Sequence, residues 1–284
     1  MDKRSVSAVI AYCSPAGATR HVARAIEAAL GEFGIPCKTL DIGKEETRRS
    51  ARSEVAALGP SACLFVGSPV YVNHAVPPVA DFIADLASGA DAAAVPFVTW
   101  GGASSGVALH EMGSALADKG FRLMGAAKVL GRHSMMWRSR SPIGDGRPGD
   151  EDDRQVQEMV ATVIRRLTEA GSGGPVSLQD LDYQPAAIRE ELAAASLEKA
   201  RAHMPQRTVH GDRCTECGLC VDACPTDAVE LSPFPVFNDR CISCFNCVRV
   251  CPEDAISADL TKTEEMIRAR AERFREAPET QIFL

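Results

Sequence analysis

The sequence is poor in aromatic residues and has no long apolar runs. Phe, Trp and Tyr make up 5% of its 284 residues, with three tyrosines and two tryptophans. No apolar stretch approaches the ~20 residues that a membrane-spanning helix needs. The apolar run before Tyr12 is too short for a signal peptide, and no small-residue cleavage site follows it. We therefore expect a cytoplasmic protein without a membrane span.

Two common nucleotide-binding signatures are also missing. No G-x-G-x-x-G run directly follows a predicted strand, and no Walker lysine is present. The sequence thus predicts no site for a nicotinamide dinucleotide or for ATP. Hydrophobic residues nevertheless make up 45% of the chain, which supports a packed core and excludes global disorder. The length allows one domain of ordinary size and one small domain.

Cysteine, by contrast, is abundant and strongly patterned. Eight of the eleven cysteines form two runs with the spacing C-x2-C-x2-C-x3-C-P, offset by 27 residues. Three thiolates spaced in this way hold a [4Fe–4S] cluster together with a fourth, and in two-cluster proteins the fourth cysteine of each run ligates the other cluster. We therefore predict one cluster held by Cys214, Cys217, Cys220 and Cys251, and a second held by Cys241, Cys244, Cys247 and Cys224.

Two other interpretations of the cysteines were weighed. Structural zinc sites usually take separated pairs of ligands, often with His, and neither run contains a His. A disulfide framework is disfavoured because the spacings are too tight for internal bridges and nothing marks the chain as secreted. The segment 210–258 resembles a bacterial two-[4Fe–4S] ferredoxin.

The cysteine-rich segment is also acidic. Residues 210–257 contain eight acidic and three basic residues, which gives −5 of the total net charge of −7. This excess disfavours nucleic acid, whose phosphates require Lys and Arg, and favours a redox protein partner with a basic docking face. Ordinary solubility charge is an equally good explanation.

The first 170 residues alternate predicted strands with predicted helices. Strands are expected at 5–12, 35–41, 61–67, 94–100 and 122–130, and helices through Val22 to Leu30 and at 45–57, 76–87, 105–119 and 151–169. Such alternation implies an α/β fold in which a parallel sheet is covered on both faces.

Three loops at the carboxyl ends of these strands have ligand-binding chemistry, and ligands of such sheets bind at those ends. The loop 14–19 offers hydroxyls, a glycine and free N–H groups at a helix start, which suits a phosphate. The loop 67–73 presents Tyr71. The loop 99–106 is rich in glycine, which permits close approach of the backbone to a ring.

Residues 5–170 resemble flavodoxin and its iron–sulfur-linked relatives, whose doubly wound sheet has five parallel strands in the order 2-1-3-4-5. The first loop is similar to the family's T-x-T-G-x-T phosphate loop, although Ala16 lacks a hydroxyl. The resemblance implies flavin mononucleotide (FMN), with Tyr71 stacked on its ring and Trp100 as a second flank; packing in the core is the alternative for both aromatics. The implied FMN-binding residues are Ser14, Ala16, Gly17, Ala18, Thr19, Pro69, Val70, Tyr71, Asn73, Trp100, Gly101 and Gly102.

The remaining segments are predicted to connect these parts. A glycine-rich break at 171–175 ends the first domain, and a helix follows from Pro185 to about Met204. We expect this connection to lie along the first domain and to return the clusters near Tyr71 or near the long loop that starts at His133, within one chain or across a homodimer. That loop is interpreted as a lid or as mobile surface.

The predicted organisation has four parts: a flavodoxin-like domain at 1–170, a linker and connecting helix at 171–209, a small α+β ferredoxin domain at 210–258, and a C-terminal part at 259–284 that consists of a helix (261–276) and an apolar tail (281–284).

As a whole the chain resembles fused flavodoxin-like/ferredoxin proteins, which combine an FMN module with two [4Fe–4S] clusters. The resemblance implies an anaerobic electron-transfer flavoprotein that passes low-potential electrons between its cofactors and a redox partner. An FMN-dependent reductase of a small molecule, such as a quinone or a corrinoid, is the alternative, and a redox or oxygen sensor is a third hypothesis. No residue is assigned as catalytic.

Overall fold

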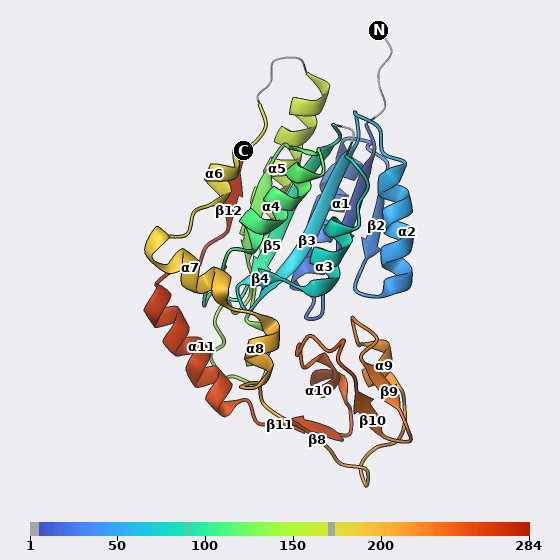
Figure 1. Ribbon diagram of the computed structural model, residues 1–284, viewed down its shortest axis with the longest axis vertical. Helices are drawn as coiled ribbons and strands as arrows, with labels where there is room; N and C mark the ends of the chain where they lie inside the picture. Colours follow the sequence, from blue (N-terminus) through green and yellow to red (C-terminus); the bar gives the residue numbers. More distant parts are fainter. Residues whose placement is uncertain (1–5, 90, 170–173) are drawn as a thin grey trace.

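The computed structural model describes residues 6–89, 91–169 and 174–284 and has an α/β part with a smaller cysteine-rich part beneath it (Figure 1). Five parallel strands run in the order β2-β1-β3-β5-β7. Their bounds are Ala8–Tyr12 (β1), Cys37–Asp41 (β2), Cys63–Tyr71 (β3), Ala93–Trp100 (β5) and Ala126–Leu130 (β7).

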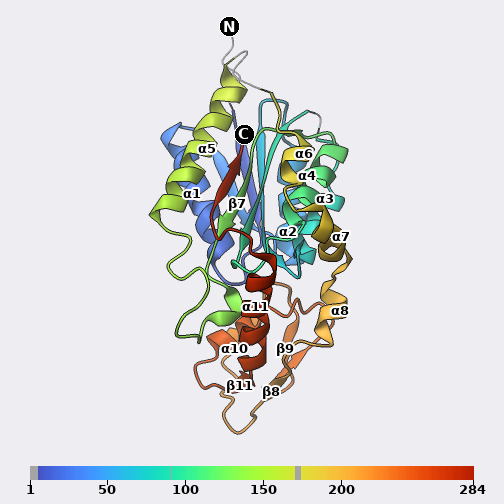
Figure 2. The same cartoon turned by 90° about the vertical axis from the view of Figure 1, so that its left-hand side faces the viewer.

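Helices cover both faces of this sheet, because its central strands are apolar on both sides. Side chains alternate along β1, so that Val9 and Ala11 join one core cluster while Ala8 and Ile10 join the other. Figure 2 shows α1 and α5 on one side and α2, α3 and α4 on the opposite side. Their bounds are Ala18–Glu32 (α1), Glu45–Ala56 (α2), Pro77–Ala84 (α3), Ala108–Asp118 (α4) and Asp150–Thr168 (α5).

The sheet has more strands than the five predicted. The C-terminal tail forms β12 (Gln281–Phe283) and pairs antiparallel with β7, which covers an edge that would otherwise expose unpaired backbone groups. The short strands β4 (His74–Ala75) and β6 (Arg122–Leu123) pair with β3 and β5.

The predicted fifth strand is split. Arg122 pairs with Ala93, whereas Ala127 pairs with Phe97, so one extra residue enters between β6 and β7. An inserted residue of this kind is a β-bulge. The expectation of one continuous strand at 122–130 was therefore wrong.

The connecting segment also differs from its prediction. The single helix expected from Pro185 is broken into α7 (Ala186–Ala194) and α8 (Leu197–Arg201), preceded by α6 (Leu178–Leu181). The break occurs because the Ser196 hydroxyl accepts a hydrogen bond from the Lys199 N–H at 3.2 Å and so begins a new helix. Of the predicted glycine-rich break, residues 171–173 lie outside the described residues.

Two segments run along the α/β part. Val176 and Leu181 lie in the core cluster beneath α4, which confirms that the connecting segment packs on the first domain. After the cysteine-rich part, α11 (Thr261–Phe274) leads back along the molecule to β12 (Figure 1).

The cysteine-rich part repeats its backbone as well as its sequence. Positive φ angles recur at positions 27 residues apart: 55° at Glu216 and 54° at Ser243, and 50° at Asp227 and 47° at Asp254. The elements are β8 (Arg207–Val209), α9 (Leu219–Asp222), β9 (Val229–Leu231), β10 (Pro235–Phe237), α10 (Asn246–Val250) and β11 (Ile256–Ala258). In the described parts of the chain, no helix is long and apolar enough to cross a membrane.

Candidate functional site

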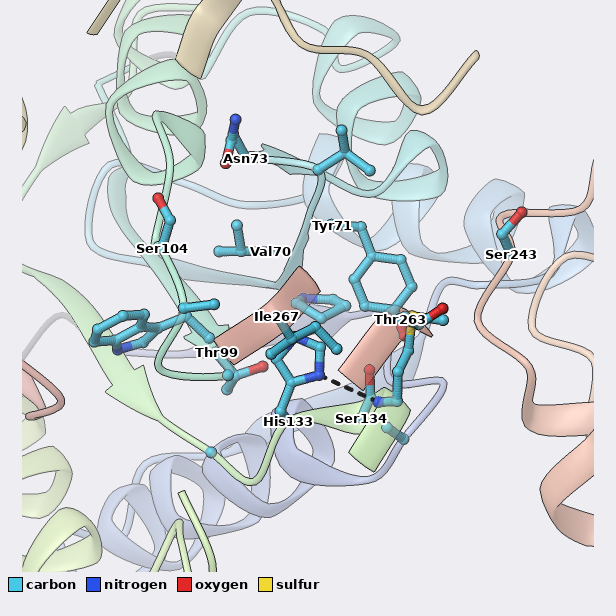
Figure 3. A pocket seen from close by; sticks show the side chains of 18 of the residues that line it. Val70, Tyr71, Asn73, Thr99, Ser104, His133, Ser134, Ser243, Thr263 and Ile267 are labelled. Carbon is cyan, nitrogen blue, oxygen red and sulfur yellow. Dashed lines mark hydrogen bonds between the residues drawn. The ribbon is translucent and has the colours of Figure 1, made fainter. Parts of the chain in front are cut away.

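A cavity of about 350 Å³ lies at the carboxyl edge of the sheet (Figure 3). Its inner wall comes from the three predicted loops and from the segment 131–135 after β7. Its outer wall comes from α8, α11 and two residues of the second cysteine run, Ile242 and Ser243. The cavity therefore brings together seven stretches of chain that are separated in the sequence.

Most residues predicted to bind FMN line this cavity. They are Ala16, Ala18, Thr19, Pro69, Val70, Tyr71, Asn73, Trp100 and Gly101. The other three lie in the same loops but do not line it. The Ser14 hydroxyl accepts a hydrogen bond from the Arg20 N–H at 2.9 Å, Gly17 precedes α1 with a φ of 99°, and Gly102 packs against Ile143. Binding itself stays a prediction for all twelve.

The first loop has the chemistry of an anion site. The N–H groups of Ala18 and Thr19 belong to the first turn of α1 and so have no intrahelical acceptor. The buried hydroxyls of Thr19 and Thr99 are 2.8 Å apart, which joins the first loop to the third. One hydrogen of the two hydroxyls is not used in this bond and is available to an anion.

Tyr71 lies in the cavity wall, and its ring is directed toward Ser134 (Figure 3). Its hydroxyl is buried and makes no hydrogen bond of ordinary geometry among the described residues, although the Ser134 side chain is close enough to oppose the rise in its pKa. Burial also raises the pKa of the Tyr71 phenol well above its ordinary value, so the hydroxyl stays protonated. A buried donor without a partner is one that a bound molecule would satisfy.

Trp100 is more deeply buried than a side chain that only flanks a flavin ring needs to be. It is 2% exposed, and the Lys128 ammonium lies 4.9 Å from the centre of its ring. This cation–π contact occupies one face of the indole. Trp100 thus contributes to the sheet core as well as to the cavity wall.

His133 lies in the segment after β7 and is a neutral group in the cavity wall. Its Nδ1 accepts a hydrogen bond from the Met135 N–H at 3.3 Å, so in the neutral ring Nε2 carries the proton. Burial lowers the pKa of His133 to about 4. A side chain at Gly101 would come within 2.6 Å of the imidazole, which explains why this loop needs glycine.

Sequence reasoning missed the outer wall. On α11 the lining residues are Thr263, Met266, Ile267 and Arg270, and on and after α8 they are Leu197, Ala200, His203 and Met204. The α11 residues share one helix face, and their spacing of three and four is visible in the sequence. Nothing in the sequence indicated which part of the molecule that face covers.

The second cysteine run faces the α/β part. Ile242 lies in the core cluster that includes β1 and β3, and Cys244 packs against the same cluster. From the other side, Met135 and Trp137 pack against the core of the cysteine-rich part. These contacts place the second cysteine run near the loops of Tyr71 and His133, as expected, whereas the first run lies elsewhere.

Arg207 contacts the predicted ligands of this run. Its Nη1 lies 3.1 Å from the sulfur of Cys241 and 4.0 Å from that of Cys247, and its guanidinium lies 4.0 Å from the centre of the Phe237 ring. A donor to ligand sulfurs is one of the means by which a protein tunes a cluster's reduction potential.

The first cysteine run is at the opposite, outer end. A second and smaller cavity there is lined by Cys214, Cys217, Cys220 and Cys251, the four cysteines predicted to share one cluster. Cys217 is exposed. Among the described residues no group of three or more His, Cys, Asp or Glu side chains is arranged to hold a single metal ion.

Comparison with known proteins identifies this segment. Residues 207–266 match the family model of the 4Fe-4S dicluster domain, and the match contains all eight cysteines of the two runs. The segment is therefore an iron–sulfur domain, and the zinc and disulfide interpretations are not needed. No curated protein matches the chain.

Several solved structures resemble the α/β part. They include rubredoxin:oxygen oxidoreductase from Desulfovibrio gigas (20% identity, 57% of this chain, 36% of that chain, TM-score 0.43), a flavodoxin from the domain Archaea (16%, 57%, 99%, 0.41) and oxidised flavodoxin 2 from Bacillus cereus (15%, 56%, 99%, 0.43). The chain thus spans 36% of the length of the first of these. Because these TM-scores are below 0.5, they say nothing about the cofactor or the activity of this chain. The fold is assigned from the strand order β2-β1-β3-β5-β7 of its own sheet. The chain joins a flavodoxin-like α/β part to an iron–sulfur domain.

Proposed function

We propose that this protein is an electron-transfer iron–sulfur flavoprotein that passes low-potential electrons between two [4Fe–4S] clusters and FMN. One observation carries the proposal: Ile242 and Ser243, which lie between predicted cluster ligands, line the same cavity as the three flavodoxin-like loops. Electron transfer needs cofactors in proximity, and this arrangement places the second cysteine run at the wall of the flavin cavity.

The residues around the cavity fit FMN. The N–H groups of Ala18 and Thr19 suit its phosphate, and the unpartnered hydroxyl of Tyr71 and the loop at Gly101 suit a polar aromatic ring. When bound, FMN supplies a ring that exchanges one or two electrons. The chain orients that ring and, with α8 and α11, excludes water and oxygen from it.

The two cysteine runs then have different roles. The second run meets the cavity, and the first, with exposed Cys217, meets solvent. Exposed Leu219 and Leu231 line the cavity of the first run, and Phe234 and Val236 are exposed in the same domain. Together with the acidic excess of this domain, they favour docking of a redox protein with a basic face at the outer end. The cavity is complete within one chain, so a homodimer is not required.

The cavity volume favours a carrier over a reductase. Pockets for small molecules have volumes of roughly 300–1,000 Å³, and about 350 Å³ is at the low end of this range. A flavin ring would use most of that space, whereas a reductase acting on a quinone or a corrinoid needs room for a second molecule beside the ring. A reductase is the second candidate, because α8 and α11 cover the cavity in the way that helices cover the substrate site of an enzyme.

Anaerobic purification followed by rapid mixing tests the proposal. We expect about eight irons and eight sulfides per chain, together with FMN. After reduction through the clusters by a dithionite-type donor, the flavin should be reduced at a rate that does not depend on protein concentration. A slow rate that rises steeply with protein concentration would mean that the cofactors are not connected within one molecule. Zinc without inorganic sulfide would contradict the cluster assignment.

A further inference from the structure

Arg270 brings a positive charge to the cavity, and no carboxylate of the described residues forms an ion pair with it. It lies on the face of α11 that lines the cavity. Within the described ranges its guanidinium makes one hydrogen bond, from Nη2 to Asn73 Oδ1 at 2.9 Å, and lies 4.9 Å from the centre of the Phe274 ring. A guanidinium has five N–H donors, so most of its donors have no protein partner there.

Other arginines of the same helix are paired. Arg268 Nη2 lies 2.7 Å from a carboxylate oxygen of Glu264, and Arg273 Nη2 lies 2.5 Å from one of Glu191. Burial lowers the pKa of Arg270, and the neighbouring Arg273 adds to this effect while the more distant Glu191 offsets part of it. Cations are seldom buried unless they are paired, because desolvation is costly. Arg270, which lines the cavity, is the one of these three arginines of α11 for which the described residues form no ion pair.

The contact with Asn73 fixes the guanidinium without neutralising it. Asn73 is 5% exposed, has a left-handed backbone with a φ of 73°, and donates from Nδ2 to the Leu192 carbonyl oxygen at 3.1 Å. Its Oδ1 is therefore the amide atom turned toward Arg270. Since an amide carries no net charge, this contact does not neutralise the guanidinium, and Glu191, the carboxylate that acts on Arg270 from a distance, is already paired with Arg273.

We propose that Arg270 is the anion-binding residue of the cavity and binds a negatively charged oxygen of the cavity's occupant. That oxygen belongs either to the carboxylate of a small acceptor or to the flavin ring, which gains negative charge on taking up electrons. A fixed cation beside a flavin favours the reduced state. The inference rests on the proposed function and adds to it a residue from outside the flavodoxin-like part.

Three variants isolate this charge. Arg270→Gln removes it and keeps a polar side chain, Arg270→Lys keeps it, and Arg273→Gln removes an equal charge on the same helix outside the cavity. Each is compared with the unmodified protein in its anaerobic form, with iron content and circular dichroism as checks of folding. Two properties are measured: the midpoint potential of bound FMN, and the affinity for benzoate from the shift in thermal unfolding.

The results separate the two sources of the anion. If the anion is the flavin, Arg270→Gln lowers the midpoint potential while Arg273→Gln does not; a tenfold loss of preference for the reduced ring is about 30 mV for a two-electron couple. If the anion is a small carboxylate, Arg270→Gln weakens benzoate binding at least tenfold and the potential is unchanged. Arg270→Lys should lie between Arg270→Gln and the unmodified protein.

The inference is overturned if Arg270→Gln matches Arg273→Gln in both measurements. The benzoate measurement does not require flavin, so it tests Arg270 even in protein that holds no FMN. Absence of FMN from the unmodified protein would instead contradict the proposed function.

Discussion

Arg249 donates a hydrogen bond from Nη2 to the carbonyl oxygen of Pro15 at 2.8 Å. Arg249 lies in α10, between two predicted cluster ligands, and Pro15 lies in the loop expected to hold the FMN phosphate. Nearby, Lys44 Nζ lies 3.3 Å from a carboxylate oxygen of Asp227, and a side chain at Gly43 would meet the Pro225 carbonyl oxygen. The loop 14–19 and the iron–sulfur domain are therefore in direct contact.

Replacing Arg249 should weaken that contact. A hydrogen bond to a charged group contributes about 1.5–3 kcal/mol, so Arg249→Gln should lower the temperature of unfolding and slow flavin reduction through the clusters. Rapid mixing and thermal unfolding measure the two effects. Arg213→Gln, an exposed change in the same domain, is the control. Equal rates in the two variants would show that this contact does not couple the parts.

A matched pair of variants tests whether the fourth cysteine of each run ligates the cluster of the other run. Cys251 lines the small cavity of Cys214, Cys217 and Cys220, so Cys251→Ser should damage the outer cluster and spare the one at the large cavity. Cys224→Ser should have the opposite effect. Electron paramagnetic resonance of the reduced protein distinguishes the two clusters. Damage confined to the cluster of the mutated run would show that ligation is not crossed.

Thr19 is predicted to contribute to FMN binding through its hydroxyl. Thr19→Ala should weaken FMN by roughly 1–3 kcal/mol, because a charged acceptor loses a donor. The contact with Thr99 makes Thr99→Ala the appropriate control, since it breaks the same bond from the other side. Equilibrium titration of flavin fluorescence gives both affinities. If both variants lose the same affinity, the Thr19 hydroxyl holds the two loops together and does not bind phosphate.

Features that depend on the spacing of nearby residues could be predicted from the sequence, whereas contacts between distant segments could not. The cysteine runs and the three loops could be recognised because each has its chemistry within a few residues. The outer wall of the cavity could not, because Arg270 and Met266 lie on a helix whose charged composition suggests a solvated surface. The tail at 281–284 was noted as apolar, but its antiparallel pairing with β7 depends on an open sheet edge that only the fold reveals.

His133 should make stability depend on pH. Its pKa is about 4 in the folded protein because it is buried, whereas an unfolded chain binds a proton at His below about pH 6.5. Acid therefore favours the unfolded chain, and this contribution to stability is lost as the pH falls from about 6.5 toward 4.

The variant His133→Asn retains an acceptor for the Met135 N–H and removes the titration. Relative to the unmodified protein, its unfolding temperature should fall less between pH 7 and pH 5. His110→Asn, on α4, controls for the loss of a histidine. Parallel pH profiles for His133→Asn and the unmodified protein would contradict the assignment of this effect to His133.

The final prediction concerns the buried ion pair that holds the end of α11. Lys128 Nζ lies 2.7 Å from Glu276 Oε1, and both side chains are largely buried, at 2% and 13% exposure. Glu276, the second residue after α11, also accepts a hydrogen bond from the Ser105 N–H at 2.8 Å, which ties the end of this helix to the loop that follows β5.

Removing one partner should leave an unbalanced buried charge, so Lys128→Met or Glu276→Gln alone should cost about 3–5 kcal/mol of unfolding free energy. The double variant removes both charges and should cost less than the sum of the two, because the single losses include the penalty of the unpaired partner. Urea unfolding of the four proteins completes the cycle. Strictly additive losses would show that Lys128 and Glu276 act independently, and the outer wall of the cavity would then depend on the packing of α11 rather than on this ion pair.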